Sequence, residues 1–172
     1  NKTAHTSIGI AGIGYAVPGT VIAIGVLIPA AWLDNHIDYL STLYLDMPIG
    51  LLFSGSMIIL VFAYLVRFLS ISLNTMDSGL SAIKPGLDES ARSLGASKSN
   101  VLTRIHMPIL KTSVLTAFLL VFVEVMKELP TTLILRPFNF NTLAVKTYEL
   151  ASDERLLDAA LPALCIVMIS LI

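Results

Sequence analysis

Long apolar runs separated by short polar segments dominate this chain. The first run, Ile8 to Leu33, contains no charged residue, and a second begins at Met47 and continues past Arg67 to Leu73. A third extends from Ile109 to Leu135. Each exceeds the roughly 20 apolar residues that a helix needs to cross a bilayer. The pattern therefore predicts membrane-spanning helices.

The fourth apolar run, from Ala159 to Ile172, is shorter. Its roughly 14 residues give about 21 Å of helix, against about 30 Å of hydrocarbon. The predicted fold is an all-α, polytopic transmembrane helical bundle with about four spans. Residues 1–172 are expected to form a single module that is a fragment, truncated at both ends.

Two positions inside these runs interrupt a simple helix. Pro18-Gly19 either breaks the first helix, as pathway-lining helices commonly do, or only kinks it. Arg67 is expected either to extend its side chain to the membrane interface or to pair inside the bundle.

The polar segments predict the topology. Residues 34–46 form a predicted loop with three Asp and no Lys or Arg, whereas residues 84–111 contain five Lys/Arg and two Asp/Glu. Because basic loops remain in the cytoplasm, segment 84–111 is predicted inside and segment 34–46 outside. Further on, residues 136–141 predict a loop and Leu143–Leu150 a short interfacial or re-entrant helix. Ser152 is expected to cap the last helix.

Composition agrees with a membrane protein. Hydrophobic residues make up 55% of the chain and charged residues 13%, about half the charged share of soluble domains. The mean hydropathy is +0.82. The single cysteine, Cys165, can form no internal disulfide.

The segment 84–111 predicts two short helices joined by a tight turn. Pro85 suits the first position of a helix, and Gly95 is placed to end that helix in a left-handed conformation. Ser97 can then cap a second helix. Pro108 is expected to block its direct continuation and to open the next helix.

A DNA-binding helix-turn-helix has similar spacing at Ala91, Gly95 and Val101. However, the basic excess of segment 84–111 is modest, and the segment lies between two uncharged spans. A soluble DNA-binding domain would not be embedded in this way. No nucleic-acid partner is expected.

The same segment carries a spaced motif, E-x-A-x3-G-x9-I-x-x-P. Its matched positions are Glu89, Ala91, Gly95, Ile105 and Pro108. The motif resembles the EAA loop of membrane-spanning subunits of binding-protein-dependent ATP-binding cassette importers, with Ser90 and Met107 departing mildly from that pattern. The resemblance implies that this loop contains a coupling helix, which docks on a cytoplasmic ATPase.

Other segments are similar to iron(III)-type permeases of that family, most closely to their C-terminal module. They are YAVPGT at 15–20, KELP at 127–130, LRPF at 135–138 and YELASDE at 148–154. The resemblance implies a permease in the bacterial inner membrane, with ferric iron as substrate and thiamine or phosphonate as alternatives. It also implies a cytoplasmic ATP-binding cassette subunit, a periplasmic substrate-binding protein and a second permease module or subunit as partners.

Charged residues inside the third run are candidate pathway residues, together with Pro18 and Gly19. Glu124, Lys127 and Glu128 lie at i, i+3 and i+4, so on one helix they share a face. We expect Glu124 to pair with Lys127 within the bundle and Glu128 to face the outer mouth, where a carboxylate suits a cationic substrate. Alternatively, the helix ends near Lys127 and these charges only mark the interface.

The chain is not expected to be an enzyme. It contains no G-x4-G-K-[ST] phosphate loop and no Cys/His cluster with metal-ligand spacing. We therefore expect no cofactor in this chain, with Mg-ATP bound by the partner subunit. The rival classes are an ion-coupled secondary transporter and a membrane-anchored DNA-binding regulator.

Overall fold

The computed structural model describes residues 15–171, and all regular structure in that range is helical. The three longest helices are α2 (Gly19–Leu45), α3 (Met57–Ser81) and α6 (Met107–Lys127). The shorter elements are α4 (Pro85–Ser93), α5 (Lys98–Val101), the π turn η1 (Leu102–His106), α7 (Pro130–Leu135), α8 (Leu143–Ser152) and α9 (Leu156–Ser170). The all-α prediction is confirmed.

Within residues 15–171, three helices are long and apolar enough to cross a membrane: Gly19–Leu45, Met57–Ser81 and the continuous helix Lys98–Lys127. The last helix, α9, is apolar but has 15 residues. Each predicted run therefore contains one apolar helix, although the bounds differ. The predicted first span starts among residues 8–14, which lie outside the described range.

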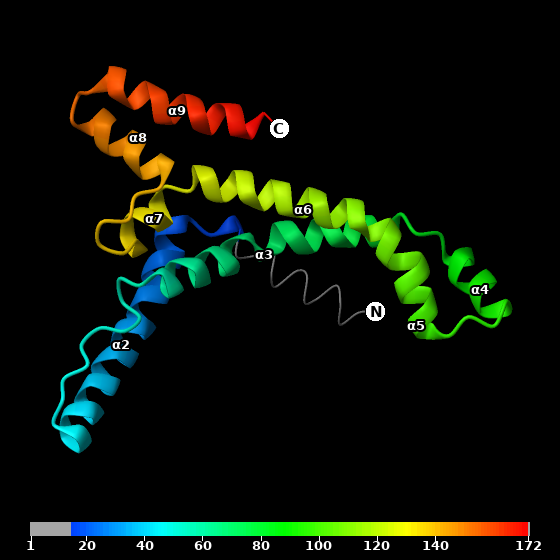
Figure 1. Ribbon diagram of the computed structural model, residues 1–172, viewed down its shortest axis with the longest axis horizontal. Helices are drawn as coiled ribbons and strands as arrows, with labels where there is room; N and C mark the ends of the chain where they lie inside the picture. The colour runs from blue at the N-terminus through cyan, green and yellow to red at the C-terminus, as the bar shows by residue number, and fades with distance from the viewer. Residues whose placement is uncertain (1–14, 172) are drawn as a thin grey trace.

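The long helices α3 and α6 lie side by side in opposite directions (Figure 1). The short helices α4 and α5 extend from one end of this pair, and α7 and α8 lie at the other. Helix α9 turns back against α8 and touches α6, whereas α2 projects away from the pair. The loop segment 84–111 and the segment after α6 thus occupy opposite ends of the molecule.

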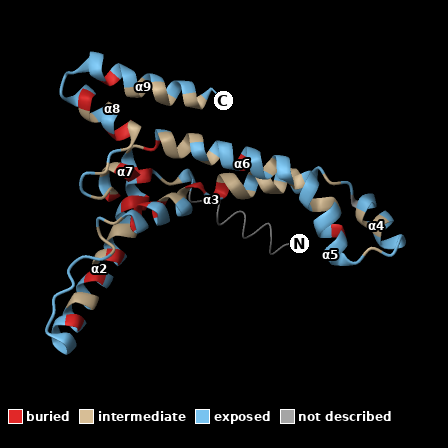
Figure 2. Cartoon of the chain, viewed as in Figure 1, coloured by how far each residue is buried: buried red, intermediate tan, exposed pale blue. Residues whose placement is uncertain are grey.

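The core lies where α2, α3 and α7 meet (Figure 2). Its buried members are Ile22, Ala23, Ala30, Ile59, Leu60, Ala63 and Leu135. Most other apolar side chains of the long helices are exposed in this single chain. Apolar surface on this scale suits lipid or neighbouring protein rather than water.

The expected loop at 34–46 is wrong, because α2 continues to Leu45. Asp34 is fully buried in the middle of this helix. Its carboxylate accepts hydrogen bonds from three successive backbone N–H groups, those of Leu52 (3.0 Å), Phe53 (2.8 Å) and Ser54 (2.7 Å). The acid is thus an internal cap for a neighbouring non-helical segment. That segment, residues 46–56, also makes the predicted helix start at Met47 wrong.

The expected interruption at Pro108 is also wrong. Residues 98–127 form one continuous helix, in which the N–H of Met107 bonds to the carbonyl of Leu102 across the π turn. Proline normally clashes with the carbonyl four residues before it. The wider π turn accommodates the ring, so the helix continues without a break.

The expected capping role of Ser152 is wrong as well. Ser152 is the last residue of α8, and Arg155 precedes the first residue of α9. Glu154 has a φ of 61°, and the N–H of Arg155 bonds to the carbonyl of Leu150 at 2.9 Å. This left-handed ending closes α8 and sets the direction of α9.

Candidate functional site

The coupling-loop segment forms the helix–turn–helix that the sequence predicts. Helix α4 begins at Pro85, and Gly95 follows it with a φ of +84°. The N–H of Ala96 bonds to the carbonyl of Ala91 at 3.0 Å, which closes the helix end. The hydroxyl of Ser97 then accepts the N–H of Asn100 at 3.3 Å and caps α5.

The apolar face of α4 has no cover within the described chain. Leu87 is 44% exposed and Leu94 is 89% exposed, although Leu is usually buried. Glu89 and Ser90 are also exposed, and Ala91 is half-buried. The remaining motif positions lie on the following helix, with Ile105 in the π turn and Pro108 in α6.

A hydrogen bond that the sequence analysis missed connects the two halves of this loop. The Nε2 atom of His106 lies 2.7 Å from Oδ1 of Asp88. The two residues are 18 positions apart, so no local spacing marks them as partners. Because His106 belongs to the π turn and Asp88 to α4, the contact holds α4 against the first turns of the long helix 98–127.

The predicted break at Pro18-Gly19 is confirmed over the alternative of a kink. Pro18 is extended, with φ −55° and ψ 138°, and α2 begins at Gly19. Since Pro18 donates no backbone hydrogen bond, the helix ladder is interrupted here. The carbonyl of Val17 instead accepts a hydrogen bond of 3.1 Å from Nη1 of Arg67.

A second break follows α6. The helix ends at Lys127, Glu128 is extended with φ −71° and ψ 110°, and Pro130 opens α7. The Oε1 atom of Glu128 accepts the backbone N–H of Thr131 at 3.1 Å and its hydroxyl at 2.6 Å. The carboxylate therefore serves the start of α7 as a cap.

Arg67 connects the two breaks. Its Nε lies 3.1 Å from Oε2 of Glu128, and the two side chains are only 17% and 7% exposed. Of the two placements expected for Arg67, pairing inside the bundle is therefore the observed one. Gly19 lies directly against the pair, because a Cβ at this position would lie 2.6 Å from Oε1 of Glu128.

The three charges predicted to share one helix face do not do so. Glu124 and Lys127 pair at 2.8 Å, as expected, and remain partly exposed. Glu128 lies beyond the end of the helix and turns inward to Arg67, so the expectation that it faces an outer mouth is wrong. Pro18, Gly19 and Glu128 are thus gathered at one junction, from which Glu124 and Lys127 are separate.

Threonine hydroxyls complete the junction. The hydroxyl of Thr132 donates to the carbonyl of Glu128 at 2.6 Å and lies 2.5 Å from the hydroxyl of Tyr64. Because Thr132 has one proton and uses it on Glu128, Tyr64 must be the donor in the second contact. Tyr64 thereby ties α3 to the start of α7.

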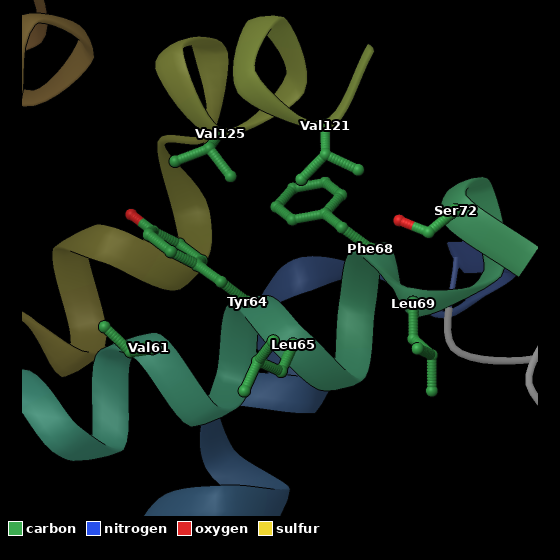
Figure 3. Close-up of a pocket in the computed structure, with 8 residues that line it drawn as sticks. All are labelled: Val61, Tyr64, Leu65, Phe68, Leu69, Ser72, Val121 and Val125. Carbon is green, nitrogen blue, oxygen red and sulfur yellow. The ribbon is translucent and has the colours of Figure 1, made fainter. Parts of the chain in front are cut away.

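An apolar cavity of about 230 Å³ lies between α3 and α6 beside this junction. Figure 3 shows Tyr64 and Phe68 projecting from α3 towards Val121 and Val125 of α6. Its eight lining residues are uncharged. Across residues 15–171, no group of three or more His, Cys, Asp or Glu side chains is arranged to hold a metal ion.

Comparison with known proteins identifies this architecture. Residues 5–172 match the family described as binding-protein-dependent transport system inner membrane component. The chain belongs to this family. The resemblance drawn from the motif around Glu89 and Gly95 is thereby confirmed at the level of the permease family.

Two relatives in this permease family carry substrate names. The chain is 28% identical over 156 residues to the Fe(3+)-transport system permease protein FbpB 2 of Haemophilus influenzae, covering 91% of this chain and 28% of the relative. It is 27% identical over 119 residues to the putative 2-aminoethylphosphonate transport system permease protein PhnV of Salmonella typhimurium, covering 69% of this chain and 45% of the relative. The chain spans less than half the length of each relative.

Proposed function

We propose that this chain is part of the transmembrane permease of an ATP-binding cassette importer in the bacterial inner membrane. The observation that carries the proposal is the exposed apolar face of α4, with Leu87 and Leu94, at the end of a bundle of membrane-length helices. An uncovered helix face in a polar loop suits a protein partner. The partner proposed for it is a cytoplasmic ATP-binding subunit, which hydrolyses ATP.

The fold offers a route from this loop to the other end of the molecule. The contact between Asp88 and His106 holds α4 against the continuous helix 98–127. That helix ends at the junction of Glu128, Arg67 and Gly19. In the proposed mechanism, movement of α4 on the ATPase is transmitted along this helix to the two helix breaks.

The candidate pathway comprises Pro18, Gly19 and Glu128 at the junction, with Glu124 and Lys127 in the last turn of α6. Broken helices in transporters commonly line the substrate route. Glu128 is neutralised by Arg67 in this arrangement, so Glu124 is the more accessible carboxylate, at 30% side-chain exposure. The remaining proposed partners are a periplasmic substrate-binding protein and a second permease module or subunit.

We propose ferric iron as the substrate, supported by the relative from Haemophilus influenzae, which aligns with 91% of this chain. A phosphonate is the second candidate, because the Salmonella typhimurium relative is named for 2-aminoethylphosphonate. Thiamine remains the third and rests on the sequence resemblance alone.

Purification and uptake test the proposal together. The tagged full-length protein should co-purify with an ATP-binding subunit, and cells should take up radiolabelled ferric iron only while ATP is available. Uptake of 2-aminoethylphosphonate in place of iron would overturn the proposed substrate but support the proposed importer function. Uptake driven by an ion gradient without any ATPase would instead indicate a secondary transporter.

A further inference from the structure

The two helix breaks leave backbone polar groups in the protein interior, where Thr131 is fully buried and Glu128 is 6% exposed. An unpaired backbone group in such a region is costly, so some side chain must satisfy it. Here the side chains come from different segments: Arg67 of α3 serves the carbonyl of Val17, and Glu128 serves the N–H of Thr131. The continuous helix α3 thus provides the hydrogen-bond donor for the backbone carbonyl at the break before α2.

The polar groups of the junction are held by hydrogen bonds and one ion pair, in which Nε of Arg67 makes a charge contact but no hydrogen bond. Oε1 of Glu128 accepts from Thr131, Oε2 faces Nε of Arg67 at 3.1 Å, and Nη1 of Arg67 donates to Val17. The hydroxyl of Thr131 also lies 3.2 Å from the carbonyl of Gly19. Its single proton serves the carboxylate, which is the closer acceptor at 2.6 Å.

The backbone at Gly19 fits tightly against this arrangement. A Cβ there would lie 2.6 Å from the Thr131 hydroxyl and 3.0 Å from Nη1 of Arg67. Helix α2 therefore begins in direct contact with the ion pair, and α7 packs on both α2 and α3. Three segments meet around one guanidinium group.

We propose that Arg67 is a positioning residue for transport, which holds the break before Gly19 and the break at Glu128 in one fixed arrangement. The proposal rests on the proposed permease function and goes beyond it, because it assigns a role to a residue that touches no substrate. The guanidinium group suits this role because its planar fork reaches two acceptors at once, which the point charge of lysine does not.

If Arg67 only neutralised the charge of Glu128, a different result would be expected. Buried ion pairs can often be replaced by apolar residues of similar volume with little loss of stability, whereas removing one partner is strongly destabilising. The double variant Arg67→Met/Glu128→Met therefore separates the two roles. It removes both charges and keeps the volume, but it no longer connects the breaks.

The experiment compares three forms of the full transporter with the wild type. They are Arg67→Lys, the double variant Arg67→Met/Glu128→Met, and a control, Arg155→Met/Asp158→Met. The control removes an exposed pair of the same charges, at 2.7 Å and i,i+3 spacing in α9. Membrane protein level, ATPase activity, and the KM and maximal rate of uptake of radiolabelled ferric iron are measured for each.

The double variant should accumulate to the wild-type level but lose maximal uptake rate by about tenfold, within the usual range of coupling between sites. The KM is compared for Arg67→Lys, which changes no candidate pathway residue and should therefore leave the KM unchanged. Arg67→Lys should show the same loss, since it retains the charge and not the fork. The control should match the wild type.

Wild-type uptake by the double variant would overturn the proposal, and so would a loss that only follows protein level. If the double variant fails to accumulate, Arg67→Lys decides: normal uptake by this variant contradicts a positioning role. If the wild type takes up no iron, the iron assignment has failed separately, and the same comparison is made with 2-aminoethylphosphonate as the probe.

Discussion

At the scale of single residues, two properties decide which positions tolerate substitution. They are the space around the Cα atom and the number of hydrogen bonds that the side chain accepts. Gly19 lies against the Arg67–Glu128 pair, whereas a Cβ at Gly25 would meet nothing within 4 Å. Asp34 and Asp38 differ in the same way. The first is fully buried and accepts three N–H groups, and the second is half-buried and accepts one, from Gly50 at 2.8 Å.

Gly19→Ala should destabilise the protein by about 1–3 kcal/mol, the usual range for overpacking, because the new methyl group displaces Glu128 or Thr131. Uptake should fall with it. Gly25→Ala, in the same helix, should leave stability unchanged or raise it, since alanine favours helix over glycine. Thermal unfolding of the purified variants measures both, and equal melting temperatures would contradict the observed fit.

Asp34→Asn should cost about 1–3 kcal/mol, because the amide turns one acceptor into a donor facing a backbone N–H group. The segment 46–56 should then exchange its amide hydrogens faster. Asp38→Asn is the graded comparison and should have a smaller effect, since its single bond is exposed to solvent. Hydrogen exchange that is equally slow in both variants would argue against Asp34 as the cap.

At the scale of elements, periodicity and helix-end signals predicted local structure well and missed what depends on distant partners. The left-handed Gly95 and the cap at Ser97 follow from residue chemistry alone, whereas at Pro18 the sequence left both a break and a kink open. The continuation of α2 through Asp34 could not be predicted, because the acid is stabilised by N–H groups 18 to 20 positions later. The inward turn of Glu128 was missed for the same reason, since its partner Arg67 lies on another helix.

Gly95→Val should separate transport from ATP hydrolysis while leaving the protein in the membrane. A β-branched residue is strained at a φ of +84°, so α4 would be turned away from its position on the ATPase. Gly95→Asn should retain more uptake, since asparagine tolerates the left-handed region. Uptake and ATPase activity are measured in parallel, and normal uptake by the valine variant at normal protein level would count against the coupling role.

At the scale of the whole molecule, the ends of the bundle differ in charge. The coupling loop at one end is basic, whereas the far end of α2 carries Asp38 and Asp46 without any Lys or Arg between residues 34 and 46. The positive-inside rule therefore predicts that the coupling loop lies in the cytoplasm. The number of apolar helices and their order were predictable from the sequence, but the projection of α2 away from the α3–α6 pair was not.

A labelling experiment tests this orientation. In a Cys165→Ser background, a cysteine at Ser99 should react with a membrane-impermeant reagent only from the cytoplasmic side. A cysteine at Tyr44, whose side chain is 78% exposed, should react from outside. Ser99 is preferred to Ser97, which caps α5. The opposite labelling pattern would exclude a cytoplasmic ATPase from α4.

The distance along the chain between Arg67 and Glu128 has a consequence for biosynthesis. Helix α3 leaves the ribosome about 60 residues before Glu128, which at roughly 5–20 residues per second is a delay of several seconds. During that interval the guanidinium group lacks its partner Glu128, and an unpaired arginine at the bilayer centre would cost about 2.5–3.5 kcal/mol on insertion. The nascent chain must therefore hold Arg67 near the lipid headgroups or inside the insertion machinery until α6 is complete. Only then can the buried ion pair form and α2, α3 and α7 assemble.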